Sequence, residues 1–157
     1  MFDTGIIATY ALIGYLFDAG ENQLAFELLS NEKEVSFAHM MRSGATTLWE
    51  NWNGEASRNH PMFGAVTKYL FTGILGIEQA DGSCGYEKVI ISPAIVDGLD
   101  RASGHITTVR GKISVSYEKK DGKIRFEVFA DPSIDAEFRF GEIKEKFAAS
   151  AVFYAEV

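Results

Sequence analysis

The sequence has few of the residues on which covalent cross-links and metal centres depend. Of its 157 residues, one is cysteine and three are histidine. A single Cys84 cannot form a disulfide within the chain, so cysteine usage does not decide between a reducing and an oxidising compartment. His39, His60 and His105 are not grouped with cysteine or acidic residues at zinc-type spacing. We therefore predict no metal site and no cofactor.

Positive charge and long apolar runs are also scarce. The chain has 15 Lys and Arg against 22 Asp and Glu, a net charge of −7, which repels nucleic acid and anionic membranes. The main apolar run, residues 5–17, is shorter than the roughly 20 residues that span a bilayer, and no basic residue precedes it as in a signal peptide. We interpret it as a buried helix, with a signal-peptide core as the alternative. We predict a soluble protein with neither nucleic-acid nor membrane partners, and the compartment stays undecided.

The spacing of apolar residues changes from helical to alternating near Ile77. Before it, we expect a helix from an N-cap at Thr4 to about Ala19, short helices over 22–30 and 37–42, and a helix with Asn59 as N-cap that ends near Gly76. After Gly82 the apolar residues alternate, and Asp121-Gly122 is a strong hairpin signal. We predict an α+β chain with a helical domain over 1–77 and an antiparallel β-sandwich of five or six strands over 78–157.

The predicted helices carry more apolar surface than they can cover among themselves. In the helix over residues 5–19, apolar residues occupy nearly the whole circumference, which is typical of a helix covered on every side. A small helical unit of this kind would expose an unusually large apolar patch. Two explanations remain open: the unit is part of a larger helical domain, which we favour, or it self-associates through its exposed helices.

One polar stretch, "GATTLWENWNGEASRNHPMFG" over residues 44–64, holds both tryptophans of the chain. Indole rings beside Glu50 would desolvate its carboxylate and favour the protonated form, as in glutamates that act as acids or bases near neutral pH. The flat rings of Trp49 and Trp52 also suit the C–H faces of sugars. Alternatively, both rings are core residues, Glu50 points to solvent, and His60 only caps or packs against the helix that follows.

The segments "GATTLWENWNG" and "NHPMFGAV" resemble the signature near the end of the catalytic domain of bacterial α-L-rhamnosidases. "DTGIIATYALIGYLFDAGENQLAFELL" is similar to late helices of that domain, and "GILGI", "GYEKVIISP" and "ASGHITTVRGKISVSYE" are similar to its exit helix and C-terminal β-sandwich. The resemblance covers most of the chain and weakens after about Phe140. It implies the last helices of a six-hairpin (α/α) barrel followed by a β-sandwich.

The resemblance also implies roles for four residues. Glu50 would be the general base of an inverting glycoside hydrolase, His60 would contact the sugar, and Trp49 and Trp52 would form walls of a rhamnose pocket. An inverting enzyme also needs a carboxylic acid roughly 6.5–9.5 Å from the base, and no family motif assigns that acid to Asp3 or Glu55. We therefore expect the C-terminal part of such an enzyme, inactive alone. The alternatives are a non-catalytic carbohydrate-binding or oligomerisation module, and a purely structural domain.

Overall fold

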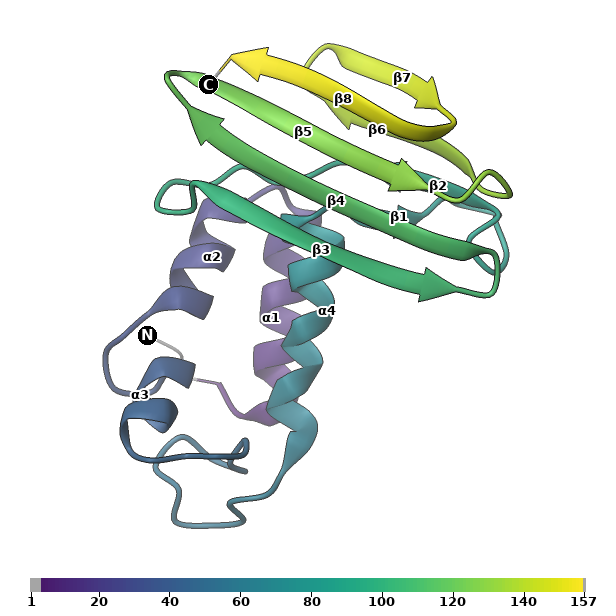
Figure 1. Ribbon diagram of the computed structural model, residues 1–157. Coiled ribbons are helices and arrows are strands. Elements are labelled where there is room, and N and C mark those ends of the chain that lie inside the picture. The colour runs from purple at the N-terminus through teal and green to yellow at the C-terminus, as the bar shows by residue number, and fades with distance from the viewer. Residues whose placement is uncertain (1–3, 157) are drawn as a thin grey trace. The chain divides into compact units, whose positions relative to one another are not determined.

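The computed structural model describes residues 4–156 and divides the chain into two compact units, Met1–Tyr69 and Leu70–Val157. The first is helical and the second contains two β-sheets (Figure 1). The predicted α+β fold class is confirmed. No helix among the described residues is long and apolar enough to cross a membrane.

The helical unit follows the predicted pattern, with two differences at helix starts. Its elements are α1 (Ile6–Asp18), α2 (Asn22–Ser30), α3 (Phe37–Arg42), the 3-10 helix η1 (Pro61–Val66) and α4 (Thr67–Tyr69). Helix α1 is capped by Gly5, not Thr4, because the Thr4 hydroxyl is bonded to that of Thr9 at 2.7 Å. His60, not Asn59, precedes the helix that Pro61 opens, so Pro61 occupies the first helical position, where its missing N–H is not needed.

Two apolar clusters are found among the described residues of this unit. One is centred on Ile13, Val66 and Tyr69, and the other on Met40, Trp49 and Phe63. Some apolar side chains outside these clusters face solvent, including Ile7 and Tyr15 of α1, which are 71% and 69% exposed. Helix α1 is apolar on nearly all sides, and contacts within the unit cover only part of this apolar surface.

The second unit begins with the π-helical segment η2 (Leu70–Ile74) and continues in two four-stranded sheets. The strands are β1 (Ile77–Gln79), β2 (Lys88–Ile91), β3 (Arg101–Thr108), β4 (Gly111–Lys120), β5 (Lys123–Ala130), β6 (Asp135–Phe140), β7 (Ile143–Phe147) and β8 (Ala149–Glu156). The orders are β1-β2-β6-β7 and β3-β4-β5-β8. The described residues form eight strands where five or six were predicted, and β2 pairs with β6 in parallel, so the all-antiparallel prediction was wrong for this pair.

The two sheets pack face to face. Phe138 of one sheet stacks on Phe153 of the other with ring centroids 4.3 Å apart, and Phe126 lies 5.1 Å from Phe138. Alternating residues of β4 and β5 add to this core, including Ile113, Val115, Ile124 and Val128, as do Val89 and Ile91 of β2. Between these strands Asp121 and Gly122 both have positive φ, as the predicted two-residue hairpin requires.

Candidate active-site loop

The polar stretch over residues 44–60 folds back on itself through backbone hydrogen bonds. The His60 N–H donates to the Leu48 carbonyl at 2.8 Å, and the Glu50 N–H donates to the Ser57 carbonyl at 2.8 Å. At the tip, the Gly54 N–H donates to the Asn51 carbonyl at 3.2 Å. These bonds pair the two sides of the loop and close its tip, which gives this surface loop a defined conformation.

Glu50 lies on one side of this loop and is half-buried. Its carboxylate oxygen Oε2 accepts a hydrogen bond from the Ser57 N–H at 3.2 Å. Since the Glu50 N–H also donates to Ser57, the two residues are joined twice, and this double link orients the carboxylate relative to the loop. A carboxylate that is partly exposed and anchored through one oxygen retains acceptor capacity for a water or a ligand.

Trp49 points into the helical unit, where 5% of its surface is exposed and it packs with Met40 and Phe63. Its ring lies against Gly54, whose φ is +69°; a Cβ at this glycine would lie 2.7 Å from the Trp49 ring. The Arg58 guanidinium lies over this ring, 5.3 Å from its centroid, and Arg58 Nε donates to the Gly54 carbonyl at 3.0 Å. The contacts among Gly54, Trp49 and Arg58 therefore hold the two sides of the loop together.

Trp52 is half-buried between the loop and the helices. Its Nε1 donates to the Thr4 carbonyl at 2.7 Å, and its ring centroid lies 4.1 Å from that of Phe63 and 5.2 Å from that of Phe37. Both indoles are thus used in packing, as in the core alternative of the sequence analysis. A contribution of either ring to a sugar pocket stays a prediction.

His60 is half-buried at the start of η1, and its side chain makes no capping hydrogen bond. Because Leu48 pairs with His60 and Glu50 pairs with Ser57, the loop brings His60 and Glu50 onto adjacent, hydrogen-bonded segments. A shallow depression of about 300 Å³ lies beside this loop, lined by Phe37, Met40, Met41 and residues 45–48. Neither Glu50 nor His60 is among its lining residues.

Sequence reasoning did not identify Gly54 and Arg58 as supports of the loop. The Asn53-Gly54 pair is a turn signal that marks the tip, but the contact of Arg58 with the Trp49 ring has no local signature. Glu55, at the tip, accepts a hydrogen bond from Asn53 Nδ2 at 2.8 Å. Asp3 lies outside the described residues. Among residues 4–156, no group of three or more His, Cys, Asp or Glu side chains could hold a metal ion.

Comparison with known proteins identifies the class of these two units. Residues 1–74 match the bacterial α-L-rhamnosidase six-hairpin glycosidase domain, and residues 76–138 match the bacterial α-L-rhamnosidase C-terminal domain. The loop over 44–60 falls in the glycosidase-domain match. The chain therefore belongs to the bacterial α-L-rhamnosidase family.

Individual relatives agree with this assignment. An α-L-rhamnosidase of Alteromonas sp. (strain LOR) is 34% identical in an alignment that covers 86% of this chain and 16% of the relative. One from Formosa agariphila is 32% identical over 85% of this chain and 15% of its own length. The crystal structure of the Streptomyces avermitilis α-L-rhamnosidase complexed with L-rhamnose has the same fold, with a TM-score of 0.88 at 23% identity over 99% of this chain and 18% of that one. The chain thus spans about a sixth of the length of these relatives.

Proposed function

We propose that this chain contributes the general base of an inverting α-L-rhamnosidase, and that Glu50 is this base. The observation that carries the proposal is the anchored, half-buried carboxylate of Glu50, placed within the "LWENW" motif by its double link to Ser57. The names of the relatives support the substrate class, a terminal α-L-rhamnoside.

In this mechanism Glu50 accepts a proton from a water molecule as the water oxygen attacks the anomeric carbon. The bond from that carbon to the glycosidic oxygen breaks on the opposite face, and a carboxylic acid donates its proton to the departing oxygen. The configuration is inverted because attack and departure occur on opposite faces. The acid must lie roughly 6.5–9.5 Å from Glu50 to leave room for the water, and we assign it to a part of the enzyme outside this chain.

His60, on the segment paired with that of Glu50, is proposed to contact the sugar hydroxyls. Trp49 and Trp52 are proposed to border the sugar from the same loop, and Trp52 is the more exposed of the two. With only one member of the catalytic pair assigned, the 157-residue chain is expected to have negligible turnover by itself.

Replacing Glu50 by glutamine in a full-length enzyme that carries this segment tests the proposal. Because general base catalysis contributes typically about 10²–10⁴-fold, Glu50→Gln is expected to lower kcat by a factor in this range, with little change in KM. Glu55→Gln, a matched change five residues away at the loop tip, is expected to retain most of the activity. An unchanged kcat in Glu50→Gln would remove Glu50 from the mechanism.

Two further measurements address the stereochemistry and the isolated chain. In the full-length enzyme, proton NMR of the first product formed should show the β-anomer of rhamnose. Hydrolysis of a chromogenic α-L-rhamnoside by the purified 157-residue chain would contradict the assignment of the acid to another part of the enzyme.

The exposed apolar side chains of the helical unit favour a second role, self-association. Ile7 and Tyr15 are two turns apart on α1, both are mostly exposed, and Met41 is 68% exposed. Apolar surface of this kind is usually covered by another protein surface. Light scattering would give a dimer mass if the isolated chain covers these residues with a second copy. A monomer would instead assign them to contacts within a larger enzyme.

A further inference from the structure

The outer face of the sheet β3-β4-β5-β8 has an unusual arrangement of side chains. The strand register aligns the outward-facing residues in rows across the sheet, perpendicular to the strands. One row consists of long side chains, Arg101, Glu118, Arg125 and Tyr154. The next two rows are Ser103, Ser116, Glu127 and Val152, and then His105, Ser114, Phe129 and Ser150.

The serines of these rows make the centre of the face hollow. Ser103 and Ser116 lie directly opposite each other, and Ser114 and Ser150 lie on the two sides of Phe129, so short side chains lie next to long ones. Two adjoining depressions result, of about 380 and 560 Å³, which share Ser103, Ser116 and Glu127 in their lining. Each is within the range of roughly 300–1,000 Å³ that is typical of small-molecule sites.

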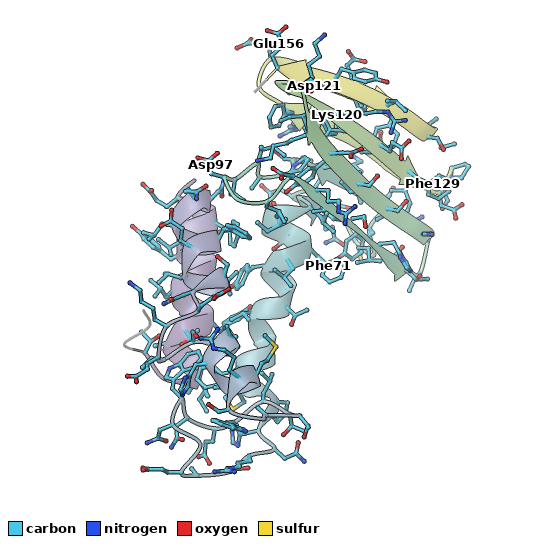
Figure 2. All side chains as sticks on the ribbon, turned by 60° about the vertical axis from the view of Figure 1, so that its left-hand side comes forward. Phe71, Asp97, Lys120, Asp121, Phe129 and Glu156 are labelled. Carbon is cyan, nitrogen blue, oxygen red and sulfur yellow. The ribbon has the colours of Figure 1, made fainter. Side chains whose placement is uncertain are left out.

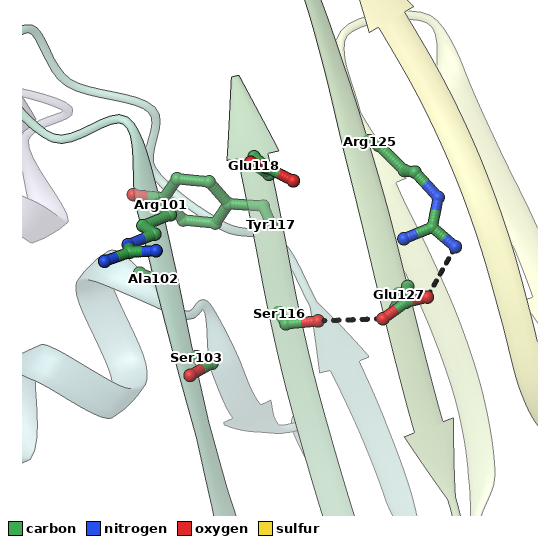
Figure 3. A pocket seen from close by; sticks show the side chains of 8 residues that line it. All are labelled: Arg101, Ala102, Ser103, Ser116, Tyr117, Glu118, Arg125 and Glu127. Carbon is green, nitrogen blue, oxygen red and sulfur yellow. Dashed lines mark hydrogen bonds and ion pairs between the residues drawn. The ribbon is translucent and has the colours of Figure 1, made fainter. Parts of the chain in front are cut away.

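The serines that line the depressions, Ser103, Ser114, Ser116 and Ser150, are called the serine floor below. A hydrogen-bonded network connects the row of long side chains to Ser116 of this floor. Arg125 Nη2 bonds Glu127 Oε1 at 2.5 Å, Arg125 Nε donates to the Tyr154 hydroxyl at 3.4 Å, and the Ser116 hydroxyl donates to Glu127 Oε2 at 3.5 Å. Figure 3 shows Ser116, Glu127 and Arg125 linked side by side, whereas the Tyr117 ring extends the other way, towards β3. Arg125 has further N–H groups and Glu127 further lone pairs beyond these bonds. The network thus presents oriented donors beside oriented acceptors.

The charges of this face indicate an uncharged ligand. The first depression is lined by two basic side chains, Arg101 and Arg125, and by two acidic ones, Glu118 and Glu127. Their formal charges cancel, so an anion or a cation would gain little net attraction. Adjacent donors and acceptors match the vicinal hydroxyl groups of a sugar, each of which both donates and accepts.

Apolar surface on the same face fits the other part of a sugar. Tyr154 is 62% exposed and Val152 is 46% exposed, both on β8, and Phe129 reaches the face from β5, where Figure 2 labels it. A tyrosine ring with a free face and a polar tip can contact the C–H face of a pyranose while its hydroxyl remains in the network.

A peptide fits this face less well. Peptides that extend a β-sheet bind at an edge strand, where main-chain groups are unpaired. Here the depressions lie on the face of the sheet, over β4 and β5, which have a hydrogen-bonded strand on both sides, and extend to side chains of β3 and β8. A ligand on this face meets side chains, as a sugar does in a binding site, and a peptide would gain no strand pairing over β4 and β5.

We propose that this face of the β-sandwich is a carbohydrate site separate from the Glu50 loop, which binds an uncharged oligosaccharide through the Arg125–Glu127 pair, the serine floor and Tyr154. The depressions are shallow and continuous, so the ligand is a chain of sugar units that lies along the face. The site performs no chemistry and does not depend on the role of Glu50.

The experiment is an NMR titration of the ¹⁵N-labelled 157-residue chain. The probes are a neutral rhamnose trisaccharide, cellotriose, trigalacturonate as an anionic sugar, and a polyserine peptide. A neutral trisaccharide is expected to shift the amide signals of Ser103, Ser116, Glu127 and Val152 in a saturable way. Arg125→Met should weaken this binding at least tenfold. The matched control is Arg139→Met, since Arg139 makes the same kind of bond to Glu137, at 2.5 Å, on β6 of the other sheet; it should alter the affinity less than twofold.

Four outcomes would overturn the proposal. One is the absence of saturable shifts on β3, β4 and β5 with either neutral trisaccharide while the wild-type spectrum is that of a folded sandwich. Another is binding of only the anionic sugar or the peptide at this face. The third is equal affinity of Arg125→Met and wild type. Shifts confined to residues 48–60 would support the Glu50 loop alone and likewise refute the sheet site, and Glu50→Gln should leave the sheet signals unchanged.

Discussion

The close contact of Gly54 with the Trp49 ring leaves no room for a side chain at position 54, and this can be tested. In Gly54→Ala the new Cβ would lie 2.7 Å from Cε3 and 2.8 Å from Cζ3 of the Trp49 ring, in a backbone conformation with φ of +69°. The ring cannot move aside easily, because it is 5% exposed and enclosed by Met40, Phe63 and Arg58. The substitution therefore combines backbone strain with a steric clash.

Gly44→Ala separates these two costs. Gly44 lies in the same loop with φ of +83°, and nothing lies within 4 Å of the position of its Cβ. Strain in the left-handed region costs about 1–2 kcal/mol, partly offset by about 0.4–1 kcal/mol from the stiffer unfolded chain. Gly44→Ala should thus lower the free energy of unfolding by roughly 1 kcal/mol. Gly54→Ala adds an overpacking cost of about 1–3 kcal/mol and should lose roughly 2–4 kcal/mol in total.

Tryptophan fluorescence during urea denaturation measures this difference in the helical unit, since the only two tryptophans, Trp49 and Trp52, both lie there. The amide signal of Ser57, which donates to Glu50, should shift in Gly54→Ala and stay unchanged in Gly44→Ala. Amide signals of β4 and β5 serve as an internal control for the folding of the sandwich. Equal stability of the two variants would refute the close contact of Gly54 with the indole.

Three further predictions concern single side chains. Burial raises the pKa of Tyr117 to about 12, and its hydroxyl has no hydrogen-bond partner among the described residues. The folded state therefore holds this proton more tightly than the unfolded state, and the resulting contribution to the free energy of unfolding, intact below pH 10, should be lost as the pH rises from 10 to 12. Tyr117→Phe should abolish this part of the pH dependence in urea titrations and leave stability at pH 7 equal or higher. A marked loss of stability at pH 7 would show that the hydroxyl is needed. Asp121→Val puts a β-branched residue at φ of +52° and should lower the free energy of unfolding, measured by thermal unfolding, by about 1–2 kcal/mol. Asp121→Asn, which is suited to this turn, should leave stability unchanged. Equal losses of stability in the two variants would argue against the two-residue turn. Trp52→Phe removes the hydrogen bond from Nε1 to the Thr4 carbonyl and should lower stability by about 1–2 kcal/mol, measured by circular dichroism; an unchanged midpoint would mean that this bond contributes nothing net.

Local signals in the sequence were sufficient for most secondary structure. Helices α2 and α3 occupy the predicted residues 22–30 and 37–42, because apolar periodicity and flanking residues define them locally. The Asp121-Gly122 hairpin is correct for the same reason: positive φ at two successive positions is a property of the turn itself. The helix caps were predicted less well, since Thr4 bonds Thr9 instead of capping α1.

Sheet pairing depended on contacts distant in the sequence. Strand β2 pairs in parallel with β6 across more than forty residues, and β1 and β7 are short strands stabilised mainly by their neighbours. The predicted end of the last helical segment near Gly76 agrees with η2, which ends at Ile74. The tertiary reason for a glycine at this position came only from the structure: its φ is +65°, and a Cβ there would lie 2.0 Å from the Ser92 backbone.

By itself the sequence determined the α+β class, the position of the "LWENW" loop and the resemblance that carries its proposed role, because these depend on residue identity and local periodicity. Only the tertiary structure decided that Trp49 turns into the core, that Arg58 and Gly54 hold its ring, and that Glu50 is anchored by the Ser57 N–H. The serine floor between Arg125 and Phe129 also came from the structure. Strand register places these residues on one face, and register is set by pairing between strands rather than by any strand alone.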